Sequence, residues 1–176
     1  MMPALLLAPM ALANESAERR AYEAAVRSST SEVRLYDGWY TALLARATLV
    51  TPEVAAFQAE RVAHLTANLG EALPPPEGIE VVLSAASHWK EALQVAGDGS
   101  APWTVTLRAG QRACAGAPSV TVLKKPSELD RTLYPHITDW DRVFRLRWSS
   151  DACGGEAPSA MDIQGRHGVG EFTWSR

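Results

Sequence analysis

The sequence predicts an α+β fold, in which an N-terminal helical hairpin precedes an antiparallel immunoglobulin-like β-sandwich. Before the triple proline at Pro74–Pro76, mainly apolar and aromatic side chains recur every three or four residues, as on one helix face. Beyond residue 78 apolar and polar residues alternate, as in half-buried strands. The prolines can continue neither a helix nor a central strand. We therefore divide the folded chain into a helical hairpin at 14–73, a proline-rich linker at 74–78 and a β-sandwich at 79–176.

Residues 1–13 have the pattern of a signal peptide. An apolar core runs from Leu5 to Leu12, and Ala11 and Ala13 place small side chains where a signal peptidase recognises its cleavage site. The mature chain would then begin at Asn14. No Lys or Arg precedes the apolar core, so an apolar N-terminus on a cytosolic protein stays open as the alternative. The core is too short for a membrane span, which needs about 20 apolar residues.

The segment 15–50 is predicted to be helical. Its repeating positions lie on one stripe of a helix, which Trp39 widens. Ser29 and Glu32 fit a capping box, so a second helix could start there, although the unbroken phase favours one long helix. The stripe consists of Tyr22, Val26, Ser29, Val33, Tyr36, Tyr40, Leu43 and Ala47.

The next helix is predicted to start at Thr51. Thr51 supplies a hydroxyl cap, Pro52 suits the first helical position, and Glu53 adds an acid in the first turn. Gly70 suits the C-terminal end of this helix. Together with the segment 15–50, it would complete the helical hairpin.

Short strands separated by turn residues are predicted after the prolines, and no connection between the later strands is long enough for a helical crossover. This arrangement favours an antiparallel sandwich over a parallel α/β sheet. The predicted strands are 79–83, 103–108, 119–123, 143–148, 161–163 and 171–174. Aromatic residues at alternating strand positions are expected in the core, namely Trp103, Phe144, Trp148, Phe172 and Trp174.

The chain has two cysteines, Cys114 and Cys153. In an exported protein this low, even number favours one disulfide, and both residues lie among turn residues, as expected for a bond between neighbouring strand ends. The entropy of closing such a loop corresponds to about 4 kcal/mol. Two free thiols are the alternative. No ligand spacing such as CxxC or HxxxH is present, and we expect neither a metal ion nor another cofactor.

The charge of the chain argues against two classes of partner. The net charge is −3, the isoelectric point is near 5.8, and arginines are interleaved with acids. A nucleic-acid-binding protein would present a basic face, and an anionic membrane would attract a polybasic run. We therefore expect neither nucleic-acid binding nor attraction to an anionic membrane. With the short apolar core, we also expect no transmembrane span, and the oligomeric state stays open.

Catalytic motifs are weak in this sequence. His136, Asp139 and Asp141 lie close together and could form an acid–base pair or a metal site, but they also suit an ordinary loop. The glycines of 165–170, which include His167, have the spacing GxxGxG. A phosphate-binding loop would precede a helix, whereas a strand pattern follows here, so a β-turn is favoured. No GxSxG nucleophile motif is present, and we assign no catalytic residue.

Four motifs of the chain are the segment Tyr36–Tyr40, the strand pattern Trp103-x-Val105-x-Leu107, the loop Tyr134-Pro135, and the closing strand Phe172-Thr173-Trp174. In these motifs about three-quarters of the chain resembles uncharacterised exported bacterial envelope proteins. The resemblance implies a helical segment followed by an immunoglobulin-like region, and it implies no known activity or catalytic residue.

The leading hypothesis is a non-catalytic binding or assembly module of the bacterial envelope, periplasmic or secreted. The aromatic residues Tyr36, Trp39 and Tyr40 are the candidate residues for binding a protein partner in the envelope. The alternative is a small periplasmic hydrolase, with or without a metal ion. That enzyme would use residues around His136, Asp139, Asp141 and His167.

Overall fold

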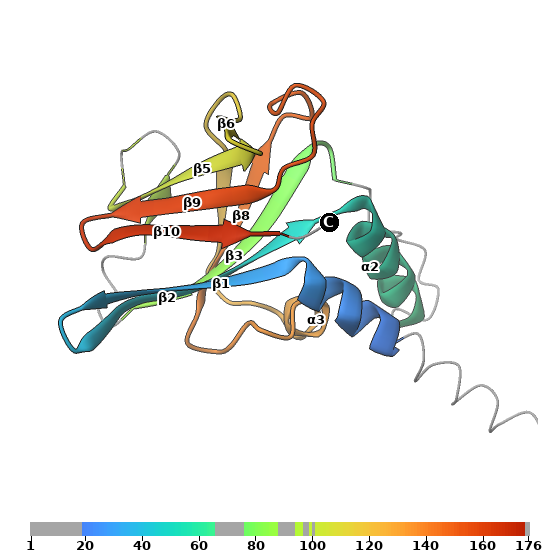
Figure 1. Ribbon diagram of the computed structural model, residues 1–176. Coiled ribbons are helices and arrows are strands. Elements are labelled where there is room, and N and C mark those ends of the chain that lie inside the picture. The colour runs from blue at the N-terminus through green and yellow to red at the C-terminus, as the bar shows by residue number, and fades with distance from the viewer. Residues whose placement is uncertain (1–18, 66–75, 88–93, 97–98, 100, 175–176) are drawn as a thin grey trace, which may run out of the picture.

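The computed structural model describes residues 19–65, 76–87, 94–96, 99 and 101–174 (Figure 1). A helix runs through residues 19–28 and leads directly into a β-hairpin. The remaining elements, in chain order, are β1 (Thr30–Asp37), β2 (Tyr40–Val50), α2 (Pro52–Leu65), β3 (Ile79–Ala86), β4 (Val95–Ala96), β5 (Trp103–Ala109), β6 (Arg112–Ala113), β7 (Ser119–Leu123), α3 (Glu128–Leu133), β8 (Arg142–Trp148), β9 (Ala160–Gly165) and β10 (Gly168–Thr173).

The strands form two sheets. The first has the order β1-β2-β3-β8-β7, and all of its neighbouring strands are antiparallel. The second has the order β10-β9-β5-β4, with β6 pairing only with β5. Its strands are antiparallel except for the short parallel pair of β4 and β5. The two sheets lie over one another in Figure 1, so each has an inner face that needs an apolar partner.

The main core lies between the inner faces of the two sheets. β2, β3 and β8 contribute from the first sheet, and β5, β9 and β10 contribute from the second. The aromatic residues at alternating strand positions are all buried there, as predicted: Trp103, Phe144, Trp148, Phe172 and Trp174. Burying these large side chains is the main source of stability in such a sandwich.

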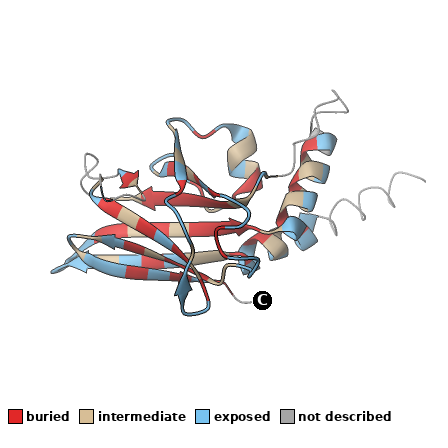
Figure 2. Cartoon of the chain, turned by 90° about the horizontal axis from the view of Figure 1, so that it is seen from above, coloured by how far each residue is buried: buried red, intermediate tan, exposed pale blue. Residues whose placement is uncertain are grey.

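A second, smaller core lies on the outer face of the first sheet. The helix at 19–28, α2 and the segment around α3 cover this face, and Figure 2 shows buried residues along the central strands and exposed ones on the outer sides of the helices. This core consists of Tyr22, Val26, Val50, Val54, Val62, Val82, Leu133, Tyr134, Ile137 and Val143. The six inner residues of β3, from Glu80 to Ala85, are therefore buried on both faces of the sheet.

The predicted helical hairpin is wrong, because residues 30–50 form two strands. The turn Gly38-Trp39 joins them, and Gly38 has a φ of 59°, which glycine adopts easily. Leu43 and Leu49 point into the main core, while the alternate residue Val50 joins the outer core. Many steps of the predicted stripe are four residues long. A step of four also returns to the same face of a strand, whereas the alternating steps of three do not, so only part of the spacing fits both structures.

The prediction of an immunoglobulin-like sandwich confined to 79–176 is also wrong. β1 and β2 belong to the same sheet as β3 and β8, β4 and β5 are parallel, and helices cover the outer face of the first sheet. The individual strands predicted after residue 78 are confirmed. The start of α2 is confirmed as well, since the Val54 N–H donates to Thr51 Oγ1 over 3.2 Å. The predicted end at Gly70 lies outside the described residues.

The edges of the two sheets meet where β10 runs beside β1. The Thr173 N–H donates a hydrogen bond of 3.1 Å to Ser31 Oγ, which links the two edge strands. Gly170 lies against Val33, and a Cβ at Gly170 would come within 2.2 Å of Val33 Cγ1. Only a glycine at this position lets the two strands approach so closely.

This packing predicts that Gly170→Ala lowers the free energy of unfolding by about 1–3 kcal/mol, the usual cost of an overpacked site. In a Val33→Ala background the added methyl group has room, so the same change should cost clearly less. Urea denaturation of the four proteins of this cycle measures both values. An equal cost in the two backgrounds would contradict the close approach of β1 and β10.

Candidate functional site

Three aromatic residues gather at the turn between β1 and β2, and we call them the aromatic tip. Tyr36 is 58%, Trp39 99% and Tyr40 67% exposed. Asp37 and Tyr40 are cross-strand partners, so Tyr36 and Tyr40 point to opposite faces of the hairpin. Figure 1 shows this hairpin projecting at the end of the first sheet that is farther from the helices.

This exposure distinguishes the aromatic tip from the rest of the predicted stripe. Tyr22 and Val26 are buried in the outer core, and Leu43 and Ala47 are buried in the main core. Isolated apolar side chains on a surface are common, but three large exposed ones around a single turn are unusual and are characteristic of interaction sites. The structure therefore places the candidate residues for binding a partner together and in solvent.

Cys114 and Cys153 form a disulfide, with their Cα atoms 4.4 Å apart. The bond joins the end of β6 to the loop between β8 and β9. Cys153 is buried in the main core, and the neighbouring backbones also pair, since the Ala115 N–H donates to the Ala152 carbonyl over 2.7 Å. The predicted disulfide is confirmed, although Cys153 lies in a loop and not at a strand end.

The carboxylates near His136 are occupied by other groups. Asp139 forms an ion pair with Arg131 at 3.0 Å, and Asp141 Oδ2 accepts a hydrogen bond of 2.8 Å from the Thr138 N–H. Both are ordinary loop interactions. The His136 ring lies instead beside the Tyr134 ring, with the ring centroids 6.2 Å apart. Its Nε2 is buried and has no hydrogen-bond partner in the described part of the chain.

His167 lies in the turn between β9 and β10, apart from the His136 loop. Its Nδ1 is 3.5 Å from Asp37 Oδ2, and its ring lies 6.2 Å from the Trp103 ring, which belongs to the main core. The turn consists of residues 166–167 between the paired Gly165 and Gly168, so the predicted β-turn is confirmed. Among the described residues no three His, Cys, Asp or Glu side chains gather to hold a metal ion.

Burial lowers the pKa of His136 from its ordinary value of 6.5 to about 4, and the nearby charge of Arg46 acts in the same direction. The unfolded chain therefore binds a proton at His136 more readily than the folded chain does between pH 6.5 and pH 4. The corresponding stability is present above pH 6.5 and is lost as the pH falls through about 4.

We expect a titration of the His136 ring followed by NMR to give a pKa near 4. We also expect His136→Gln to reduce the loss of stability between pH 6.5 and pH 4 by up to about 3 kcal/mol, as a shift of this size implies. An ordinary pKa near 6.5 would show that the ring is open to water.

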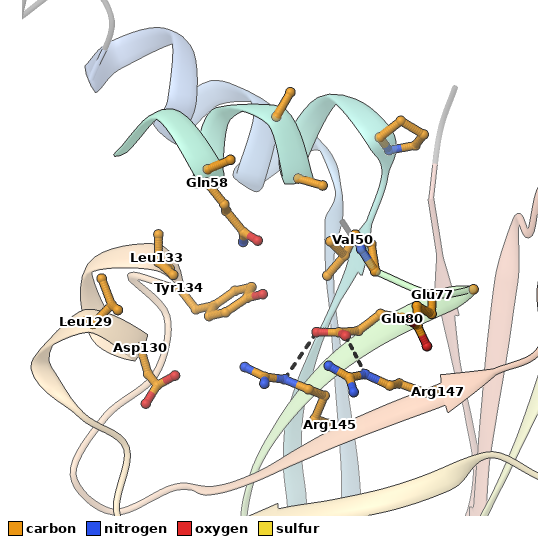
Figure 3. A pocket seen from close by; sticks show the side chains of 16 residues that line it. Val50, Gln58, Glu77, Glu80, Leu129, Asp130, Leu133, Tyr134, Arg145 and Arg147 are labelled. Carbon is orange, nitrogen blue, oxygen red and sulfur yellow. Dashed lines mark hydrogen bonds and ion pairs between the residues drawn. The ribbon is translucent and has the colours of Figure 1, made fainter. Parts of the chain in front are cut away.

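A cavity of about 880 Å³ lies between α2, the segment around α3, and the outer face of β3 and β8 (Figure 3). The sequence analysis did not predict it. Its apolar wall includes Val50, Ala55, Ala56, Ala59, Leu129 and Leu133. Its polar side includes Gln58, Glu80, Asp130, Tyr134, Arg145 and Arg147, and the exposed Glu77 lies at its rim.

Glu80 lies on the floor of the cavity between two arginines. Glu80 is only 6% exposed. Its Oε1 lies 3.1 Å from Arg145 Nε, and its Oε2 accepts a hydrogen bond of 2.7 Å from Arg147 Nε. The Arg145 contact has the distance of an ion pair but not the geometry of a hydrogen bond, so Arg145 Nε has no hydrogen-bond partner in the residues described. A buried carboxylate requires such pairing, because its desolvation is costly.

Gln58 and Tyr134 face each other across the cavity (Figure 3). Gln58 is 7% exposed, and its Nε2 has no hydrogen-bond partner among the described residues. Burial raises the pKa of Tyr134 to about 12, and the neighbouring Gln58 amide opposes that rise. Burial also raises the pKa of Tyr22, whose hydroxyl donates to the Leu133 carbonyl. Both phenols are therefore neutral and able to donate hydrogen bonds.

The sequence carried only part of this arrangement. The pattern of 143–148 placed Arg145 and Arg147 on the face opposite Phe144, but their partner depends on the strand register. In that register Glu80 lies opposite Arg147, and the two residues are far apart in the sequence. An acid in an otherwise apolar strand was the one signal that could have pointed to a buried ion pair.

The comparisons with known proteins identify no relative. No family model matches the chain, and searches of curated proteins and of solved structures give no significant match. Within the described ranges, no helix has both the length and the apolar character that crossing a membrane requires.

Proposed function

We propose that this protein is a non-catalytic binding or assembly module of the bacterial envelope, which binds a protein partner through Tyr36, Trp39 and Tyr40. The observation that carries the proposal is the exposure of these residues, above all of Trp39 at 99%. Trp and Tyr are enriched among the residues that contribute most to protein–protein affinity. On a paired hairpin they lose little further conformational freedom on binding.

Export is the second part of the proposal. The disulfide between Cys114 and Cys153 supports it, because such bonds persist in oxidising compartments and are rare in the cytosol. The signal peptide at 1–13 lies outside the described residues and stays a prediction from its sequence pattern. The resemblance to exported envelope proteins points to the same location, in the periplasm or outside the cell.

The hydrolase alternative gains less support from the structure. Asp139 is paired with Arg131, Asp141 binds a backbone N–H, and His167 lies near Asp37 in another turn. Acid–base catalysis needs side chains that converge on one substrate position. These four candidates instead make separate local interactions.

The test replaces Trp39 and Tyr40 by alanine in the disulfide-bonded protein, with Trp140→Ala as the control. Trp140 is 82% exposed and lies outside the aromatic tip. Substituting exposed residues usually changes stability by no more than about 0.5 kcal/mol. We therefore expect both proteins to keep the wild-type melting temperature.

A photo-crosslinking amino acid at position 39 should give a discrete adduct with one envelope protein in cells, and the same residue at position 140 should not. Purified partner should bind the Trp140→Ala variant like wild type and the double variant at least tenfold more weakly. Equal adducts from both positions, or unfolding of the double variant, would show that the tip is not a specific binding surface.

A further inference from the structure

We propose that the cavity between α2, α3 and β8 binds a small amphipathic carboxylate, an apolar group that carries one negatively charged carboxyl. This site is distinct from the aromatic tip. The tip lies at the Tyr40 end of β2, whereas Val50, at the other end of the same strand, lines the cavity. Strands of this length hold their two ends about 30 Å apart.

The first argument is an unpaired donor in the cavity. Gln58 is 7% exposed and points from α2 into the cavity in Figure 3. Its amide interacts with the phenols of Tyr22 and Tyr134, but Nε2 makes no hydrogen bond of good geometry within the described residues. Buried polar groups nearly always have a hydrogen-bond partner. An acceptor atom on a ligand would satisfy this group.

The second argument is the chemistry of the groups around Gln58. Tyr134 presents a neutral phenol to the same space, and Arg145 presents a guanidinium whose Nε also has no hydrogen-bond partner in the described part of the structure. All three groups can donate hydrogen bonds, and the positively charged guanidinium accepts none, so a head group made of acceptors fits beside Arg145 better than an ammonium group does.

The third argument is the charge on the floor of the cavity, where two arginines face a single carboxylate and can balance one further negative charge. Arg145 and Arg147 share the single carboxylate of Glu80, so this group of three side chains keeps one positive charge in excess. Asp130 is occupied at the start of α3, where its Oδ2 accepts hydrogen bonds from the N–H and the hydroxyl of Ser127. Asp130 and the rim residue Glu77 add two further negative charges to the lining, so its net charge is −1 and a dianion such as phosphate would be repelled.

The fourth argument is the apolar wall opposite these donors. It includes Val50, Leu129, Leu133 and three alanines of α2, namely Ala55, Ala56 and Ala59. Because the alanine side chains are small, they leave room for a hydrocarbon group beside α2. A volume of about 880 Å³ lies within the range of natural ligand pockets.

The first experiment titrates the full-length, ¹⁵N-labelled protein with octanoate, 1-octanol and octylammonium, which share a chain and differ in head group. Octanoate should shift the side-chain amide signals of Gln58 and should bind at least fivefold more tightly than 1-octanol. Octylammonium should leave these signals unchanged. Equal binding of octanoate and 1-octanol would overturn the proposal.

A parallel titration with 3-phenylpropanoate distinguishes the two sources of this chemistry. Tighter binding of octanoate would assign the site to acyl chains, and tighter binding of 3-phenylpropanoate would assign it to aromatic acids. Both outcomes support a carboxylate site. Binding of neither acid would contradict it.

Variants test the assigned residues. Arg145→Gln should weaken octanoate binding at least fivefold and leave 1-octanol binding unchanged, while the control Arg34→Gln, on the exposed surface of β1, should bind like wild type. Gln58→Leu removes the unpaired donor without exposing the core, so it keeps the test valid if Arg145→Gln does not fold. Unchanged octanoate affinity in the folded variants would overturn the assignment.

The same titration separates this site from the proposed function. The variant with Trp39→Ala and Tyr40→Ala should bind octanoate like wild type. A carboxylate site can therefore be confirmed while the partner-binding proposal fails, and the reverse outcome is equally distinguishable.

Discussion

The structure depends on burying both faces of its first sheet. The inner face packs on the second sheet, and the outer face packs under the helix at 19–28, α2 and the segment around α3. β3 lies in the middle of this arrangement and is buried along nearly its whole length. Because water is excluded from both sides, the one acid in the strand, Glu80, must be neutralised by arginines of the neighbouring β8. The central packing thus fixes the charged floor of the cavity.

Local sequence signals were enough to predict the elements whose ends are marked by capping residues or whose residues alternate clearly. Thr51, Pro52 and Glu53 mark the start of α2, and alternating residues mark strands such as 143–148. The segment 30–50 was misassigned because its steps of four fit both a helix face and a strand face. Its steps of three begin or end at Tyr36 and Tyr40, which are exposed near the turn and do not belong to the buried face. The pair Asp37-Gly38 is a known hairpin signal and could have corrected the assignment, since Gly38 occupies the left-handed region in the turn.

The two sites differ in how far the sequence could reveal them. Tyr36, Trp39 and Tyr40 stand close together in the sequence, so they could be chosen as candidates even under the wrong secondary structure. Their exposure depends on the hairpin, which a helix would not have given. The cavity could not be found in this way, because Gln58, Tyr134 and Arg145 come from three segments that only the tertiary fold brings together. Strand register and helix placement decide such a site, and neither is written in a local pattern.

The central claim is that residues 30–50 are two strands of the first sheet, since the exposed tip, the doubly buried sheet and the cavity all follow from it. Nuclear Overhauser effects between backbone protons test it most directly. The account predicts cross-strand contacts between β1 and β2, for example between Val33 and Ala45, and between β2 and β3, for example between Thr48 and Val82. Overhauser effects between backbone protons of residues i and i+3 throughout 30–50, as in a helix, would contradict it.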